Sequence, residues 1–257
     1  MKPLRVMSFN IRHARGMNGE VSLQNIVAEI QSSGTDIIGL QEVDRFLPRS
    51  NTADQPAELA RLLEMNVYYS ASEDRHNTSN AAAYIRENDA KSGLDGQYGN
   101  AILSRFPIAS HQFQYLPGNS ERRSLLQTEI EIDGRRLTFF DTHLGVSDED
   151  QTVQIDAIIE ALKSTSGAFI LLGDFNMEPE NPLLAKLSSV APKVLLEGNV
   201  TTFAGEKDAV VEIDHIFTNL KPETDTAWTQ PTEASDHHPV LAQLFVGAGF
   251  PRPVSSI

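Results

Sequence analysis

The chain has 257 residues, of which 40% are hydrophobic, and this is enough apolar material for the core of one large α/β or all-β domain. Its formal net charge is -14, so on average it repels polyanions, which disfavours a general, non-specific nucleic-acid binder. It contains no cysteine, which excludes a disulfide framework and a thiolate metal site. Any metal ion must therefore be held by oxygen and imidazole ligands.

The N-terminus passes directly from Met1 into an alternating strand pattern, without a long apolar segment. No stretch of the sequence approaches the length of a membrane span. We therefore expect a soluble, cytoplasmic protein that forms a single domain over residues 1–257, with residues 247–257 as a surface tail.

The first part of the chain alternates predicted strands with a predicted helix. A strand is predicted from Leu4 to Phe9, and it ends at Asn10. The spacing of apolar residues from Ser22 to Ser33 predicts a helix that begins with a serine cap. A second strand, Asp36 to Leu40, runs directly into Glu42. Both strands thus lead into a polar side chain.

The next part of the chain contains its least regular segment. A helix is predicted from Pro56 to Met65 and a short strand from Val67 to Ser70. The polar segment from Ser72 to Gln97 follows, with an alanine-rich piece at Asn80 to Glu87 that is compatible with a helical turn or two. Loops of this length are usually functional or mobile, so we expect this segment to close over the substrate.

An antiparallel meander is predicted in the middle of the chain. Its strands are separated by short turns, and Asp133-Gly134 is typical of a hairpin. The last of these strands leads to His143. The predicted strands are Gly99–Ser104, Ile108–Tyr115, Arg123–Ile132 and Arg135–Phe140.

The C-terminal part begins with an amphipathic helix capped by Ser147. We interpret the acids of its first turn, Asp148 to Asp150, as a solvated helix start, because negative charge is favourable near a helix N-terminus. The apolar run Ala168 to Leu172 predicts a buried strand that stops at Gly173. A short helix at Pro182 to Val190 and strands at Val210–Phe217, near Ala227 and at Val240–Val246 complete the chain.

Asp174 and Asn176 follow the buried strand directly. Alternate side chains of an extended backbone point to the same side, so we expect this carboxylate and this carboxamide to point together at the sheet rim.

Polar side chains recur at predicted strand ends along the whole chain. Carboxylates, carboxamides and imidazoles without thiols suit Mg²⁺ or Mn²⁺. Any one of these residues is explained equally well by a capped turn, but the complete set favours one metal-dependent site. The residues are Asn10, Glu42, His143, Asp174, Asn176, Asp214, Asp236 and His237.

These residue types supply the groups that hydrolysis of a phosphate ester needs. The reaction needs a base for the attacking water and donors for the charge on the phosphoryl oxygens. His237 lies beside Asp236 in the sequence, and Asp214 is at another strand end, so the composition is that of an Asp–His acid/base pair.

The motifs, in this order, resemble those of the endonuclease/exonuclease/phosphatase superfamily of metal-dependent phosphoesterases. The resemblance extends from Met7 to Leu244, and in detail it is similar to the small bacterial metal-dependent hydrolases. The motifs are Ser8-Phe9-Asn10, Leu40-Gln41-Glu42, Tyr98-Gly99-Asn100-Ala101-Ile102-Leu103-Ser104, Thr142-His143-Leu144, Gly173-Asp174-Phe175-Asn176, Ile213-Asp214-His215-Ile216 and Ser235-Asp236-His237-His238-Pro239.

The resemblance implies a fold and an active-site location. The fold would be a DNase I-like, four-layer α/β sandwich, in which two mixed β-sheets pack face to face with helices outside. The active site would lie at one rim of the sheets.

The resemblance also implies residue roles. Glu42, with Asn10 nearby, would hold Mg²⁺ or Mn²⁺, and Asp236 would be a metal or water ligand. Asp174 and Asn176 would position water and phosphate, His143 would donate to a phosphoryl oxygen, and His237 polarised by Asp214 would be the acid/base. Arg123 would contact phosphate, and His13 would line the mouth. Whether Asp174 or His237 activates the water stays open, as does the number of metal ions.

Three functions remain. The first is a metal-dependent phosphoesterase acting on a phosphodiester or phosphomonoester of a small molecule or lipid-type headgroup. The second is an endo- or exonuclease acting on DNA or RNA, which the acidic charge disfavours. The third is a catalytically silent binding module, which has no need for unpaired carboxylates at strand ends.

Overall fold

The computed structural model describes residues 3–74, 76, 82–87, 93–196, 200–205, 211–220 and 226–245. The predicted tail at 247–257 lies outside the described residues, as do several positions of the segment from Ser72 to Gln97. The beginning of that segment belongs to a strand rather than a loop, and residues 82–87 within its alanine-rich piece are helical.

Within the described ranges, six strands form the first sheet, in the order β10-β11-β1-β2-β4-β3. β1 and β2 are parallel, and the other neighbours are antiparallel, so the sheet is mixed. The strands are β1 (Pro3–Asn10), β2 (Ile37–Arg45), β3 (Asn66–Asp74), β4 (Gln97–Ser104), β10 (Thr226–Thr229) and β11 (Val240–Phe245).

The second sheet has five strands in the part of the chain that the structure describes, in the order β5-β6-β7-β8-β9. It is mixed as well, because β7 and β8 are parallel while the other pairs are antiparallel. The strands are β5 (Ile108–Tyr115), β6 (Ser124–Ile132), β7 (Arg135–His143), β8 (Phe169–Asp174) and β9 (Asp214–Thr218).

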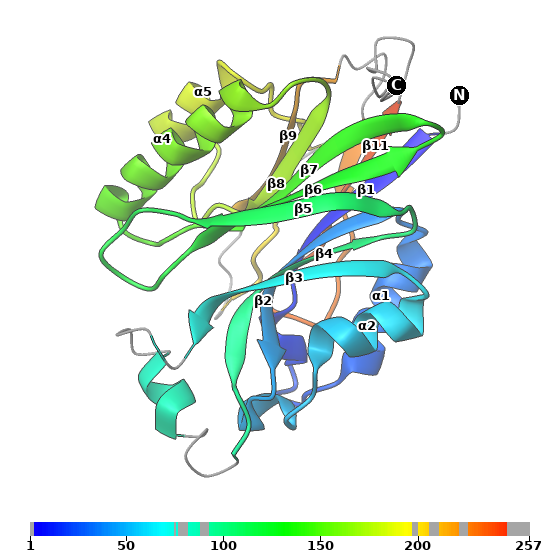
Figure 1. The fold of residues 1–257 in the computed structure, drawn as a ribbon, viewed down its shortest axis with the longest axis vertical. Helices are drawn as coiled ribbons and strands as arrows, with labels where there is room; N and C mark the ends of the chain where they lie inside the picture. Colours follow the sequence, from blue (N-terminus) through cyan, green and yellow to red (C-terminus); the bar gives the residue numbers. More distant parts are fainter. Residues whose placement is uncertain are drawn as a thin grey trace.

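The two sheets pack face to face, and helices cover their outer faces (Figure 1). α1 (Leu23–Ser33) and α2 (Gln55–Leu63) share an apolar cluster with the first sheet. α4 (Asp148–Ser164) and α5 (Pro182–Ser188) share another with the second sheet. A third cluster, with Val6 and Phe139, fills the space between the sheets. The predicted four-layer α/β sandwich is confirmed.

Local sequence signals account for the main helix boundaries. Ser22 caps α1 through a bond from Asn25 N, and Gly34 ends this helix with a left-handed φ of 63°. Ser147 caps α4 by accepting from Asp150 N. Two short 3-10 helices, η1 (Arg12–Ala14) and η2 (Pro48–Ser50), complete the named elements. No helix in the described ranges is long and apolar enough to cross a membrane.

The predicted meander is wrong at its first connection. β4 belongs to the first sheet and β5 to the second, so the chain crosses between sheets after Ser104. Only β5, β6 and β7 form a meander, closed by the predicted Asp133-Gly134 turn. A short connection is compatible with either arrangement, because the alternation of apolar side chains identifies strands but not their partners.

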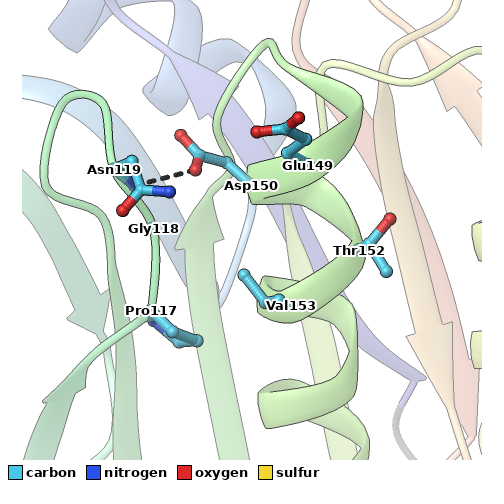
Figure 2. A pocket seen from close by; sticks show the side chains of 7 residues that line it. All are labelled: Pro117, Gly118, Asn119, Glu149, Asp150, Thr152 and Val153. Carbon is cyan, nitrogen blue, oxygen red and sulfur yellow. Dashed lines mark hydrogen bonds between the residues drawn. The ribbon is translucent and has the colours of Figure 1, made fainter.

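Asp150 also differs from its predicted role as a solvated helix residue. Its side chain is buried and accepts hydrogen bonds from Asn119 N (2.8 Å) and Ser120 N (3.2 Å), as Figure 2 shows for the first of these. These bonds lower the pKa of Asp150. The carboxylate therefore fastens the β5–β6 connection to α4, beside a surface pocket of about 580 Å³ that Pro117 and Val153 help to line.

Candidate active site

Strand direction brings the predicted site residues to one rim of the sandwich. The parallel strands β1 and β2 carry Asn10 and Glu42 near their carboxyl ends, and the parallel strands β7 and β8 end at His143 and Asp174. β9 is antiparallel to β8, so Asp214 at its start is paired with the last residue of β8.

The remaining two residues approach from the first sheet. β11 is antiparallel to β1, so the loop that precedes it, with Asp236 and His237, lies at the rim where β1 ends. Ser235 Oγ fixes this loop by donating to Asn10 O at 2.8 Å. The two sheets thus contribute to a single polar cluster.

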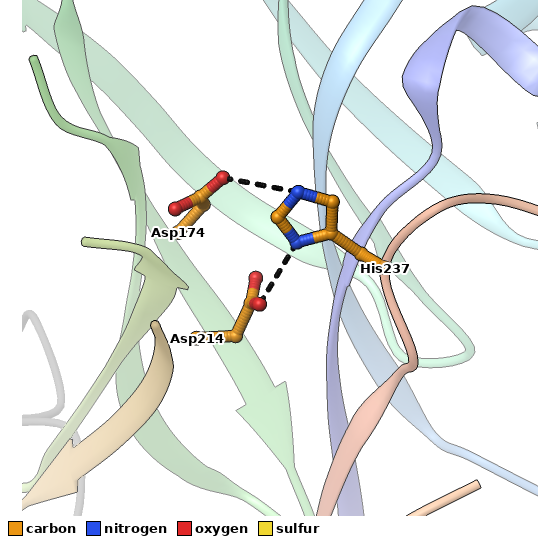
Figure 3. A group of neighbouring side chains, drawn as sticks. All are labelled: Asp174, Asp214 and His237. Carbon is orange, nitrogen blue, oxygen red and sulfur yellow. Dashed lines mark hydrogen bonds and ion pairs between the residues drawn. The ribbon is translucent and has the colours of Figure 1, made fainter. Parts of the chain in front are cut away.

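His237 lies between two carboxylates (Figure 3). Its Nδ1 donates to Asp214 Oδ2 at 2.9 Å, and its Nε2 is 3.7 Å from Asp174 Oδ2. His143 Nε2 is 3.5 Å from the same oxygen of Asp174. All four side chains are nearly inaccessible to solvent. The predicted Asp–His pair is therefore present as a hydrogen-bonded pair, and it faces a third buried acid.

A segment that the sequence did not single out supports this pair. Thr202 Oγ1 accepts from Ile213 N (2.9 Å) and Asp214 N (3.1 Å), which fixes the start of β9. The Phe203 ring lies 4.8 Å from the imidazole of His237, between ring centres, and Phe203 forms a β-bridge with that residue. The His237–Asp214 pair therefore has little freedom to rotate.

Burial and neighbouring charge shift the pKa values of the cluster in opposite directions. Burial, followed by the charge of Asp214, raises the pKa of Asp174 to about 7. Burial alone would lower the pKa of His237, but the charges of Asp214 and Asp174 outweigh it and raise the pKa to about 10. Burial, with the charges of Arg123 and His237, lowers the pKa of His143 well below its usual value, so this imidazole is neutral.

Glu42 is presented by an irregularity in β2. Its φ is 56°, at a register shift between Leu40 and Val43, so its carboxylate leaves the regular alternation of the strand. Burial raises its pKa, and a hydrogen bond from Asn10 opposes this shift. Asn10 Nδ2 donates to Glu42 Oε1 at 3.1 Å and to Asp174 Oδ2 at 3.0 Å. One amide thus links the two carboxylates across the two sheets.

The donor set at this rim fits a hard divalent cation. Asp174 is a buried carboxylate and Glu42 a partly exposed one, and carboxylate oxygens are the preferred ligands of Mg²⁺ and Mn²⁺. Asp174, Asp214 and His237 form a second possible group, with one ligand atom from each lying within 4.8 Å of the others. In this second group His237 Nδ1 is already bonded to Asp214 Oδ2, whereas Glu42 accepts, within the described residues, one hydrogen bond from Asn10.

Two predicted residues have contacts other than those expected. Asn176 has a φ of 51°, so the expected strand alternation ends at Asp174. Its backbone N–H donates to Asp174 Oδ1 at 3.0 Å, and its Nδ2 donates to Leu144 O at 2.9 Å. Asp236 Oδ2 is 3.1 Å from Arg12 Nε, so this acid fastens the β1–α1 connection.

The two predicted substrate contacts lie beside the cluster. Arg123 is 8% exposed, and its charge acts on both Glu42 and His143. In the described part of the chain its Nε has no hydrogen-bond partner. His13 Nδ1 is 4.0 Å from Glu42 Oε2. Burial, together with the charges of Arg49, Arg12 and Arg15, lowers the pKa of His13 to about 3.

The sequence matches the Endonuclease/Exonuclease/phosphatase family over residues 7–237. The chain belongs to this family. Its members are hydrolases that act on phosphate esters, and the chain is an enzyme of this kind. Among curated proteins, none matches the sequence.

Solved structures of family members have the same fold. An endonuclease/exonuclease/phosphatase from Beutenbergia cavernae is 23% identical, with a TM-score of 0.77 over 97% of this chain and 73% of its own. The mannosyl-6-phosphatase of Bacteroides thetaiotaomicron is 20% identical, with a TM-score of 0.70 over 94% of this chain and 99% of its own. Truncated TDP2 from Caenorhabditis elegans is 19% identical, with a TM-score of 0.68 over 95% and 98% of the two chains.

In this family member, two buried polar contacts beneath the site were not predicted. Gln41 Nε2 donates to Asp141 Oδ1 at 2.5 Å, which joins β2 to β7 directly under Glu42 and His143. Gln55 donates from Nε2 to His13 O at 2.8 Å and accepts from Asp44 N at 2.9 Å. Gln41 is part of a quoted motif, but no pattern in the sequence identifies its partner.

Proposed function

We propose that this enzyme hydrolyses a phosphate ester of a small molecule or lipid-type headgroup, using a divalent cation held by Glu42. The observation that carries the proposal is the convergence of Glu42, Asn10 and Asp174 with the His237–Asp214 pair at one rim. These are the groups that such a reaction needs: a cation ligand, a proton acceptor and a proton donor.

The cation would be Mg²⁺ or Mn²⁺. When bound, it supplies Lewis-acid stabilisation of the charge on the phosphoryl group. In the protein, Asn10 orients the carboxylate of Glu42 through its Nδ2 donor and holds it in register with Asp174. Asp236 pairs with Arg12 and so holds the β1–α1 connection in place beside the site. Asn10 and Asp236 thus support the cation site from its periphery.

Proton transfer is assigned to Asp174 and His237. Burial raises the pKa of Asp174 to about 7, so a water held beside this carboxylate can give its proton to it near neutral pH. Asp214 accepts from His237 Nδ1, which leaves Nε2, 3.7 Å from Asp174 Oδ2, as the nitrogen that can donate to the reacting group. We therefore propose that Asp174 is the general base and His237 the general acid.

The remaining residues bind the phosphate. His143 and Arg123 are buried at the rim with nitrogen atoms that can donate to phosphoryl oxygens. Asn176 holds Asp174 through its backbone N–H and is fastened to Leu144 O, so it fixes the position of the base. This arrangement lets the protein bind one phosphate group without a long basic surface.

Metal dependence and the role of Glu42 can be tested together. Glu42→Gln keeps the side-chain size but removes the charge that an oxygen-preferring cation needs, so cation affinity and kcat should both fall. Glu131→Gln, an exposed change on β6, is the matched control. Aryl phosphodiester and phosphomonoester substrates would be assayed with and without chelator. Full activity of Glu42→Gln at low Mg²⁺, or of the unaltered enzyme in excess chelator, would reject the proposal.

A nuclease is the second candidate, because the family includes endonucleases and exonucleases. The net charge of -14 counts against it, since nucleic-acid binding draws on many cationic contacts to phosphate. A catalytically silent module is disfavoured, because buried carboxylates such as Asp174 and Asp214 are costly to retain without a cation or a reaction to serve. Comparing rates on small esters and on oligonucleotides would distinguish these functions.

A further inference from the structure

The connection after β1 has an uncommon backbone. Arg12, His13 and Ala14 have φ values of 44°, 46° and 64°, so three consecutive non-glycine residues occupy the left-handed region. Each such residue costs on the order of 1–3 kcal/mol, and such strain concentrates at active sites and ligand-binding loops. We therefore looked for a function in the side chains that this backbone conformation positions.

Several hydrogen bonds hold this connection in place. Arg12 N donates to Asn10 Oδ1 at 3.0 Å, and Ala14 N donates to Ile11 O at 2.7 Å. Gln55, which is fully buried, donates to His13 O and also accepts from Asp44 N, two residues after Glu42. The connection is thus fastened through Gln55 to the segment of β2 that presents Glu42.

This strained backbone places the imidazole of His13 beside the carboxylate of Glu42. The His13 side chain is 13% exposed, and its Nδ1 is buried and has no hydrogen-bond partner among the residues that the structure describes. Nδ1 lies 4.0 Å from Glu42 Oε2, which is too long for a hydrogen bond. Two ligands of one cation, each bound at about 2.1 Å, lie at most about 4.2 Å apart, so this spacing is compatible with a shared ion.

We infer that His13 is a nitrogen ligand of the same cation that Glu42 holds, and that this ligand makes the site select Mn²⁺ over Mg²⁺. The inference rests on the proposed metal role of Glu42. It replaces the mouth-lining role expected for His13 from the sequence. It also explains the strain, because an extended connection would not bring this imidazole to Glu42.

The selectivity follows from ligand chemistry. Mg²⁺ is bound almost entirely by oxygen atoms and keeps several water molecules. Imidazole nitrogen is a better ligand for first-row transition metals, so exchanging one oxygen for a nitrogen raises the relative affinity for Mn²⁺. Glu42 supplies the oxygen ligand that both ions accept, and His13 supplies the one that distinguishes them.

Pulsed electron paramagnetic resonance of the metal-free protein loaded with Mn²⁺ alone tests the inference directly. A coordinated imidazole nitrogen modulates the electron spin echo. We expect this modulation in the unaltered protein, its loss in His13→Asn and its persistence in the matched variants His143→Gln and His237→Gln. Asn is chosen at position 13 because it tolerates the left-handed region and offers an oxygen in place of the nitrogen. Circular dichroism would confirm that each variant is folded.

Calorimetric titration with Mn²⁺ or Mg²⁺ gives the second readout. His13→Asn should lower the affinity for Mn²⁺ at least about tenfold and change the affinity for Mg²⁺ much less. Loss of modulation in His237→Gln instead, or its persistence in His13→Asn, would overturn the inference while leaving Glu42 as a ligand. If Glu42→Gln leaves Mn²⁺ affinity unchanged, the proposed metal role of Glu42 itself fails, and the inference fails with it.

Discussion

His237 and Asp214 form the best-defined pair of the site, and we expect them to act as a unit. His237→Ala and Asp214→Asn should each lower kcat by on the order of hundreds-fold. The fold-decrease in kcat of the double variant should be much smaller than the product of the two single fold-decreases, because Asp214 acts only by holding and polarising the imidazole through the 2.9 Å bond. Steady-state kinetics of the two single variants and the double variant checks this. Free-energy losses that add strictly would show that the two residues work independently.

Asp141 should make stability depend on pH. It is fully buried, and burial raises its pKa well above the usual value, with a hydrogen bond from Gln41 opposing. Below the pKa of the unfolded chain, about 3.9, Asp141 is protonated in both states, and its contribution to the free energy of unfolding is fully present. As pH rises toward the pKa of the folded state, the unfolded chain releases this proton first, so the contribution is lost. Its hydrogen-bond partners Gln41 and Asn100 carry no charge.

Asp141→Asn removes this titration and keeps the acceptor for Gln41. The stability of the variant relative to the unaltered protein should therefore increase from about pH 4 upward, by up to about 1.4 kcal/mol for each pH unit. Urea unfolding at a series of pH values measures the difference, in which the titration of all other carboxylates cancels. A difference that does not change with pH would mean that Asp141 is ionised in the folded protein.

At the scale of the elements, strand direction explains why so much of the site could be predicted. Asn10, Glu42, His143 and Asp174 were recognised because each follows an apolar strand, and parallel neighbours place such residues at one edge. The order of the motifs resembles that of a known family, and this resemblance implies the fold. The strand ends themselves depend only on local alternation and on residue types, which can be read from the sequence.

The features that could not be predicted depend on backbone conformation or on distant partners. Glu42 and Asn176 have positive φ values, so alternation along an extended strand does not give their direction. The pairing of Gln41 with Asp141 spans 100 positions, and the assignment of β4 and β5 to different sheets depends on packing between layers. The buried position of Asp150 could not be predicted for the same reason, because its partners Asn119 and Ser120 are remote in sequence.

The close approach of the two sheets beneath the site depends on Gly39 in β2. A Cβ atom at this position would collide with Leu172 Cδ1 and Asp141 Oδ1 of the second sheet. Gly39→Ala should therefore lower the free energy of unfolding by about 1–3 kcal/mol, because the sheets must separate locally. Gln112→Ala, on the exposed strand β5, is the control and should change stability by less than about 0.5 kcal/mol. Equal stability of Gly39→Ala and the control in denaturant unfolding would contradict this account.

At the scale of the whole molecule, charge is distributed unevenly. The chain carries a net charge of -14, yet the cations Arg12, Arg49 and Arg123 lie close enough to His13, Glu42 and His143 to shift their pKa values. These few cations at the rim can contact one phosphate group, while the net negative charge of the molecule repels an extended polyanion. This combination favours a compact substrate.

The dependence of the rate on salt should distinguish a compact substrate from a nucleic acid. Binding to duplex DNA releases one counterion for roughly each phosphate contact, so its affinity falls steeply between low and physiological salt. With only a few arginines at the rim, kcat/KM for a small aryl phosphodiester should change less than about threefold over the same range. The measurement compares this substrate with a single-stranded and a duplex oligonucleotide at several salt concentrations. Strongly salt-dependent oligonucleotide binding, with cleavage far faster than for any small ester, would establish the nuclease function instead.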